Sequence, residues 1–237
     1  MPVDTGESKQ LFFPCEDYLA AIGPGSNERT LLASSELGPI TAAAANDDLL
    51  VWSEVSQVEF ASKVRGWTSK TGAFDAFGLP AYNTGLGLSP TRVAGIMGAG
   101  ISKPNPFHEY LKRGRLWWAP WAGDSVHSSP ELPYPFYPTS FVATWGEFIA
   151  VEIFFEPNES GRELSFLLLA RVTDWKMRIL ERTPEIEFGE GSFALTSKYL
   201  YVVPKVMQER GGYLAASAFR YDLSAFDSVG VPLEPAP

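Results

Sequence analysis

The chain has 237 residues, of which 45% are hydrophobic and 20% are charged, as is typical of a globular protein with its own apolar core. Its 19 basic and 28 acidic residues give a formal net charge of −9, which disfavours binding to nucleic acid or to anionic membranes. The single cysteine, Cys15, excludes an intrachain disulfide framework.

The two ends of the chain have the composition of tails. Residues 1–10 are polar and lack the apolar segment of a secretory signal peptide, and residues 231–237 are rich in proline. No apolar run is long enough to cross a bilayer. We therefore expect a flexible amino-terminal tail over 1–10, one domain over 11–230 and a proline-rich tail over 231–237. The expected location is the cytoplasm or a larger particle, without secretion by a signal peptide and without membrane insertion.

Short apolar runs separated by tight polar turns predict β-hairpins along the whole chain. In chain order the predicted pairs are 11–14 with 18–22, 40–45 with 49–55, 86–88 with 92–97, 141–144 with 148–155, and 193–195 with 199–203. Further runs over 63–68, 73–77, 163–172, 175–180 and 213–221 fit outer strands of the same sheets. Helical periodicity is scarce, so the sequence predicts an all-β protein.

The spacing of these pairs favours a β-propeller. The second runs recur at a mean interval of about 45 residues, which is the length of one four-stranded propeller blade. Four-stranded sheets stacked around an axis bury both faces and leave only short edges. We therefore predict an all-β, propeller-like domain of about five four-stranded units, with an open or distorted propeller-like fold and a β-sandwich or barrel as the alternatives. In a closed propeller, the segments 11–14 and 229–233 would complete one blade together.

One segment, 98–138, interrupts this spacing and is predicted to be an irregular insertion. Within it, Asn105 followed by Pro106 has the signature of a helix start, and Gly114 has that of a helix end, so a short helix is expected between them. A strand over 116–121 and a proline-rich loop over 130–138 follow.

Aromatic residues gather in this insertion and form the predicted binding site. They are Trp117, Trp118, Trp121, Tyr134, Phe136 and Tyr137. Their flat faces could form a protein interface or stack on a sugar. The alternative is that alternate members of the strand point inward and belong to the core.

The sequence offers only weak candidates for chemistry. Acidic residues in equivalent turns, Asp17, Asp47, Asp48 and Glu147, could form the carboxylate pair of a glycosidase, but acids are also ordinary turn formers. Glu152 and Glu156 share one face of a predicted strand, where a solvated position or a salt bridge is expected. His108 and His127 are isolated, and no P-loop or nucleophile elbow is present. We expect no catalytic residues, no cofactor and no metal.

These observations predict a non-enzymatic interaction or structural subunit of a multiprotein assembly, with a phage virion or tail accessory protein as one setting. The expected partners are other proteins of the assembly and not nucleic acid. One alternative is a lectin-like propeller with a carbohydrate partner at the aromatic segment, and a second is a glycoside hydrolase.

Overall fold

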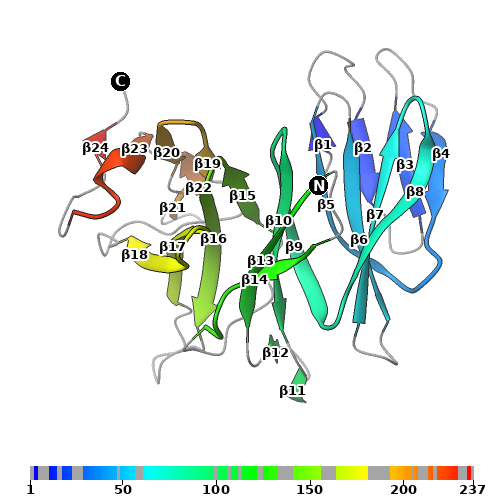
Figure 1. The fold of residues 1–237 in the computed structure, drawn as a ribbon, viewed down its shortest axis with the longest axis horizontal. Coiled ribbons are helices and arrows are strands. Elements are labelled where there is room, and N and C mark those ends of the chain that lie inside the picture. Colours follow the sequence, from blue (N-terminus) through cyan, green and yellow to red (C-terminus); the bar gives the residue numbers. More distant parts are fainter. Residues whose placement is uncertain are drawn as a thin grey trace.

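The computed structural model describes residues 3–4, 11–14, 18–22, 29–46, 49–56, 61–98, 101–105, 108–111, 114–121, 125–132, 141–155, 164–180, 193–203, 205–207, 213–215, 218–228 and 234–235. Within these residues the strands form five four-stranded antiparallel sheets, here called sheets 1 to 5 in chain order (Figure 1). The only helical element among them is a 3-10 turn, η2 (Leu223–Ala225). The predicted all-β, propeller-like fold with about five four-stranded units is confirmed.

Each sheet is built from one continuous stretch of chain. Sheet 1 contains β1 (Val3–Asp4), β2 (Leu11–Pro14), β3 (Tyr18–Ile22) and β4 (Arg29–Ser34). Sheet 2 contains β5 (Ile40–Ala45), β6 (Leu50–Ser56), β7 (Ala61–Thr68) and β8 (Gly72–Leu79). Sheet 3 contains β9 (Tyr82–Leu88), β10 (Arg92–Gly98), β13 (Arg115–Pro120) and β14 (His127–Ser128). Sheet 4 contains β15 (Val142–Trp145), β16 (Phe148–Phe155), β17 (Leu164–Arg171) and β18 (Lys176–Leu180). Sheet 5 contains β19 (Phe193–Leu195), β20 (Tyr199–Val202), β23 (Phe219–Asp222) and β24 (Glu234–Pro235).

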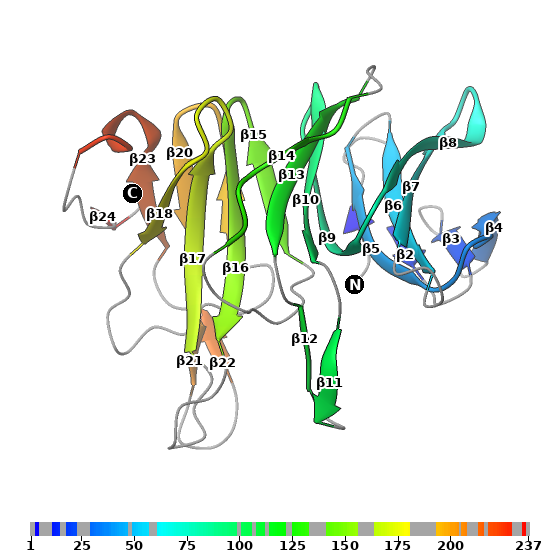
Figure 2. The same cartoon turned by 60° about the horizontal axis from the view of Figure 1, so that its bottom comes forward.

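Two small hairpins are inserted at equivalent places. The hairpin of β11 (Ile101–Asn105) and β12 (His108–Leu111) lies between the second and third strands of sheet 3. The hairpin of β21 (Lys205–Met207) and β22 (Tyr213–Ala215) lies between the same strands of sheet 5. Figure 2 shows both hairpins at the same end of the molecule. The opposite end, called here the tight-turn end, carries the short connections between first and second strands, such as those before Arg92 and Phe148.

The hairpin of β11 and β12 corrects the predicted helix from Asn105 to Gly114. Ile101 pairs with Leu111, and Asn105 pairs with His108, as in an antiparallel hairpin. Proline disfavours a helical conformation in the residue that precedes it, so Pro106 holds Asn105 in extended backbone. An isolated helix of this length would also be marginal in water. The predicted insertion 98–138 is in addition less irregular than expected, because it contains β13 and β14 of sheet 3.

Apolar clusters join each sheet to the next, which is the packing expected of propeller blades. Leu19 of sheet 1 packs with Trp52 of sheet 2, and Val64 of sheet 2 packs in one cluster with Trp117 of sheet 3. Sheets 3 and 4 meet through a cluster that includes Ile96 and Ile149. Sheets 4 and 5 meet through one that includes Leu167, Leu200 and Tyr221. The second strands of sheets 2 and 3, β6 and β10, are buried on both faces along almost their whole length.

The described residues contain four such clusters, whereas a closed ring of five sheets would need five. No cluster joins sheet 5 back to sheet 1 within the described part of the chain. Figures 1 and 2 agree on the reason, because sheet 1 and sheet 5 stand at opposite ends of the longest axis. The expectation that both chain ends complete one blade is wrong for the described residues. Val3–Asp4 pairs with β2 in sheet 1, and Glu234–Pro235 pairs with β23 in sheet 5. Residues 229–233 lie outside the description.

In the described segments there is no helix with the length and apolar character that a bilayer crossing requires.

Candidate functional site

The predicted aromatic residues do not form one surface. Successive side chains of a strand point to opposite faces, so β13 sends its tryptophans in two directions. Trp117 packs into the core between sheets 2 and 3, and Trp121 contacts the same core. Trp118 instead contacts the core between sheets 3 and 4. Tyr134, Phe136 and Tyr137 lie outside the described residues.

Trp117 is a core residue with no solvent exposure. Its Nε1 donates a hydrogen bond to Asn83 Oδ1 at 2.8 Å, and the Phe77 ring meets it edge to face at 5.6 Å. Gly95 lies beneath the indole, where a Cβ atom would come within 2.7 Å of Nε1. Trp117 is therefore held on several sides by the protein and has no face for a partner.

Trp121 is half-buried at the edge of the same core. Its ring meets Phe74 edge to face, with centroids 5.6 Å apart. Both rings cover Gly66, because a Cβ atom there would lie 2.7 Å from the Trp121 ring. This contact explains the glycine in an otherwise well-packed strand.

Trp118 lies between a cation and an imidazole. The Arg92 Cζ atom is 4.5 Å from the Trp118 ring centroid, and the His127 ring stacks on the indole at 4.4 Å with an interplanar angle of 18°. The three residues come from adjacent strands in the order β10, β13 and β14. Arg92 and Trp118 are half-buried, and His127 is exposed. The register places them at the tight-turn end of sheet 3.

Three nitrogen atoms of this group have no acceptor within the described part of the chain. Arg92 Nε, Arg92 Nη1 and Trp118 Nε1 are all buried without a hydrogen-bond partner. Burial lowers the pKa of the Arg92 guanidinium, and the Glu147 carboxylate opposes this change by raising it. Glu147 is exposed and follows Trp145, which is 37% exposed, in the turn between β15 and β16. We call Arg92, Trp118, His127, Trp145 and Glu147 the Trp118 surface.

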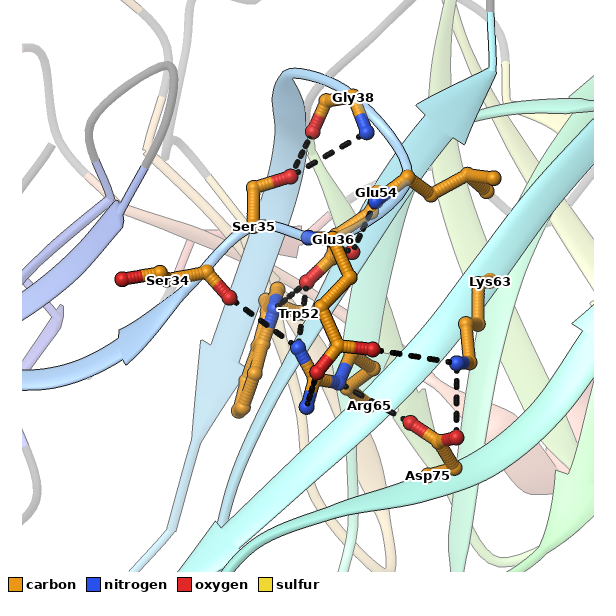
Figure 3. A network of polar contacts seen from close by, with 10 residues as sticks. Ser34, Ser35, Glu36, Gly38, Trp52, Glu54, Lys63, Arg65 and Asp75 are labelled. Atoms are coloured by element: carbon orange, nitrogen blue, oxygen red, sulfur yellow. Dashed lines mark hydrogen bonds and ion pairs between the residues drawn. The ribbon is translucent and has the colours of Figure 1, made fainter.

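A second polar group is centred on Glu54, whose side chain is fully buried and well paired (Figure 3). Glu54 Oε2 accepts hydrogen bonds from the backbone amides of Glu36 and Leu37 at 2.9 and 3.1 Å. Its Oε1 accepts from Trp52 Nε1 at 2.9 Å and from Arg65 Nη1 at 3.2 Å. Burial alone would raise the pKa of Glu54, but these hydrogen bonds together lower it.

Arg65 connects this carboxylate to the surface. Its Nη2 lies 3.0 Å from Glu36 Oε1, and its Nε lies 3.1 Å from Asp75 Oδ1. Lys63 Nζ pairs with the other Asp75 oxygen at 2.7 Å. Figure 3 shows how these side chains hold the connection between sheets 1 and 2 against sheet 2. Because each of its charged groups has a partner of opposite charge, the network is suited to fixing that connection in place.

The acidic residues predicted from the sequence are not brought together where the structure describes them. Glu147 is exposed and accepts a hydrogen bond from Thr173 Oγ1 at 3.4 Å. Glu152 is completely buried in β16, which corrects the expectation of a solvated position. Asp17, Asp47, Asp48 and Glu156 lie outside the described residues. His108 and His127 lie on different sheets.

Sequence reasoning did not identify Glu54, Arg65 or Arg92. A signal for the first two was present, since Trp52 and Glu54 alternate on one predicted strand and Arg65 is paired with Trp52 on the next. Opposite charges on adjacent apolar strands indicate a buried ion pair. Arg92 gave no such signal, because a charged residue directly after a turn is common.

The sequence matches no family model and no curated protein sequence. The fold, however, is similar to solved β-propeller structures. The β-propeller domain of the Trilobed protease from Pyrococcus furiosus, reported to have an open velcro topology, superposes with a TM-score of 0.57 at 11% identity over 99% of this chain. A structure from the nidogen/laminin complex gives a TM-score of 0.57 at 10% identity over 94% of this chain, and the tricorn protease gives 0.54 at 10% identity over 92%.

This chain spans 24% of the tricorn protease chain, 75% of the nidogen/laminin chain and 69% of the Trilobed protease propeller. At such low identity the similarity establishes the β-propeller fold alone.

Proposed function

We propose that this protein is a non-enzymatic interaction subunit of a multiprotein assembly, and that it binds a protein partner through the Trp118 surface. The observation that carries this proposal is the stack of Arg92, Trp118 and His127. Tryptophan and arginine contribute most to binding energy at protein interfaces. Here they are combined at the border of two sheets, with hydrogen-bond donors that have no acceptor among the described residues.

Two further features support a protein partner. The neighbouring turn exposes Trp145, one of only four large apolar side chains exposed in the described residues. The similar structures include one determined as a complex of two proteins, nidogen and laminin. A rigid stack of sheets that presents side chains from several strands is a suitable scaffold for such an interface.

The assembly that we propose is a phage virion or tail, on the basis of the acidic, cysteine-poor composition of the chain.

The geometry favours a protein over a carbohydrate at this surface. A sugar ring would stack on a free aromatic face, but Arg92 and His127 flank Trp118 on its two neighbouring strands. A protein partner can instead use the donors and the exposed Trp145 beside them.

Affinity purification from the native lysate tests the proposal. The tagged chain is compared with a Trp145→Ala/His127→Ala variant by quantitative mass spectrometry, after chemical crosslinking. We expect the variant to recover the crosslinked partner about tenfold less, as loss of an interface centre predicts. Sedimentation of the partner-bound fraction shows whether it belongs to a particle.

A matched control is Leu31→Ala, which removes a 61% exposed apolar side chain from sheet 1. This variant should recover the partner like the unmodified chain. The proposal is wrong if the chain stays alone in its lysate, or if both variants recover the same partners in the same amounts.

A further inference from the structure

We infer that the Trp118 surface binds an acidic peptide segment of its partner, with a carboxylate of that segment paired to Arg92. This inference rests on the proposed function and names the chemistry of the partner.

Arg92 differs from Arg65 and Arg171, which both pair with carboxylates of the chain. Arg65 has three carboxylates within 3.2 Å, from Glu36, Glu54 and Asp75. Arg171 has two, from Asp174 and Asp227, each at 2.6 Å. Arg92 has none within ion-pair distance in the described structure, although the chain carries 28 acidic residues. Buried cations are ordinarily paired, so an unpaired arginine beside a surface indicates an acceptor supplied from outside.

The unpartnered atoms define what that acceptor must be. Arg92 Nε, Arg92 Nη1 and Trp118 Nε1 are all donors, and none of them can accept a hydrogen bond. A carboxylate has two oxygens that only accept, and its geometry matches the fork of a guanidinium. A neutral amide or hydroxyl would satisfy fewer donors and would leave the charge without a counter-ion.

The charge around the site favours a single negative group. Only one cation, Arg92, is unpaired here, and the exposed Glu147 acts on it electrostatically. A phosphate carries nearly two charges and would meet stronger repulsion from Glu147. Nucleic acid would in addition meet a net charge of −9. The side chain of aspartate or glutamate fits these conditions.

The site is only partly oriented for this role. Trp118 and His127 stack in nearly parallel planes, and the Arg92 guanidinium lies over the indole, so the three groups are together before a partner arrives. Arg92 is half-buried, and its neighbours His127 and Glu147 are exposed. Because Nε and Nη1 have almost no accessible area, docking requires a side-chain rearrangement, which is common at interfaces.

Fluorescence anisotropy with labelled hexapeptides tests the inference. The probe is a fluorescein-labelled peptide of six glutamates, and the matched control is the same peptide with six glutamines, both in 0.15 M salt at about physiological screening. We expect the glutamate peptide to bind more tightly than the glutamine peptide. Arg92→Gln should weaken this binding by about tenfold, whereas Glu147→Gln should strengthen it about two- to threefold by removing a like charge.

Circular dichroism and thermal unfolding show whether Arg92→Gln is folded, and Glu147→Gln supplies a second test on a surface residue. Equal binding of both peptides overturns the inference, as does an Arg92→Gln protein that is folded and binds like the unmodified chain. If this happens while Trp145→Ala/His127→Ala still loses its crosslinked partner, the proposed function stands without the carboxylate. If the Arg92 effect on peptide binding is absent and Trp145→Ala/His127→Ala also keeps its partner, both the inference and the proposed function are wrong.

Discussion

Two charged residues, Glu54 and Arg92, illustrate how different surroundings give different roles. Glu54 is completely buried, and four hydrogen bonds satisfy its two oxygens. Arg92 is half-buried, and two of its nitrogens have no acceptor among the residues that the structure describes. The first arrangement holds the protein together, because every charge has a partner within the chain. The second arrangement leaves hydrogen-bond donors that a partner could satisfy, which is why we propose Arg92 as part of the partner site.

Replacing Arg65 by methionine should destabilise the protein strongly. The Glu54 carboxylate would stay buried without its cation, and breaking a buried pair in this way costs about 3–5 kcal/mol. Urea unfolding followed by circular dichroism measures the change. Arg115→Met is the control, because the Arg115–Glu131 pair is exposed at 3.2 Å and such pairs contribute about 0–1 kcal/mol. Equal effects of the two substitutions would contradict the structural role of the Glu54 network.

Acidification should weaken the contact between sheets 4 and 5. Hydrogen bonds from Arg171 lower the pKa of Asp174 to about 2, and those from Arg171 and Lys176 lower the pKa of Asp227 to about 2, from an ordinary 3.8. Because the pKa is lower in the folded state, the stabilisation is complete above the ordinary value and disappears as the pH falls toward 2.

The unfolding temperature measured from pH 5 to pH 2 tests this prediction. Asp227→Asn should flatten the dependence, since it removes one of the two titrating partners of Arg171. An unchanged slope in this variant would show that the pair does not contribute.

Successive side chains of a strand point to opposite faces of the sheet. This alternation decides which of the predicted aromatic residues belong to the Trp118 surface. Trp117 and Trp118 are neighbours in sequence, but they contact different cores on the two sides of sheet 3.

Close packing at the Trp117 face also requires glycine. A Cβ atom at Gly95 would lie 2.5 Å from the carbonyl oxygen of Gly85, so the strand tolerates no larger residue there.

Gly95→Ala should therefore destabilise the protein by about 1–3 kcal/mol, the usual cost of overpacking a core. Gly78→Ala is the matched control, because a Cβ atom at Gly78 in β8 meets nothing within 4 Å. Chemical denaturation of both variants provides the comparison. Similar stabilities would show that the packing beneath Trp117 is looser than described.

At the scale of the whole molecule, the individual hairpins could be predicted from the sequence, but whether sheets 1 and 5 meet to close a ring could not. The predicted hairpin over 40–45 and 49–55 matches β5 and β6 almost residue for residue, because alternation and turn chemistry are local. The arrangement of sheets 1 and 5 depends on contacts between the two ends of the chain, which no local pattern reports. The helix predicted from Asn105 failed because capping residues are also compatible with a hairpin turn. The site that we propose at Arg92 could not be foreseen, because its argument rests on buried donors without an acceptor in the described residues and not on a sequence motif.

The separation of sheets 1 and 5 determines which surfaces are free. It can be measured by electron–electron double resonance between spin labels in a Cys15→Ser background. One pair joins Leu31→Cys in sheet 1 to Val203→Cys after β20 of sheet 5, and a reference pair joins Leu31→Cys to Thr71→Cys in sheet 2. We predict a clearly longer distance for the first pair than for the reference pair. A first pair as short as the reference would mean that sheets 1 and 5 are neighbours in a closed ring, and would contradict the open arrangement.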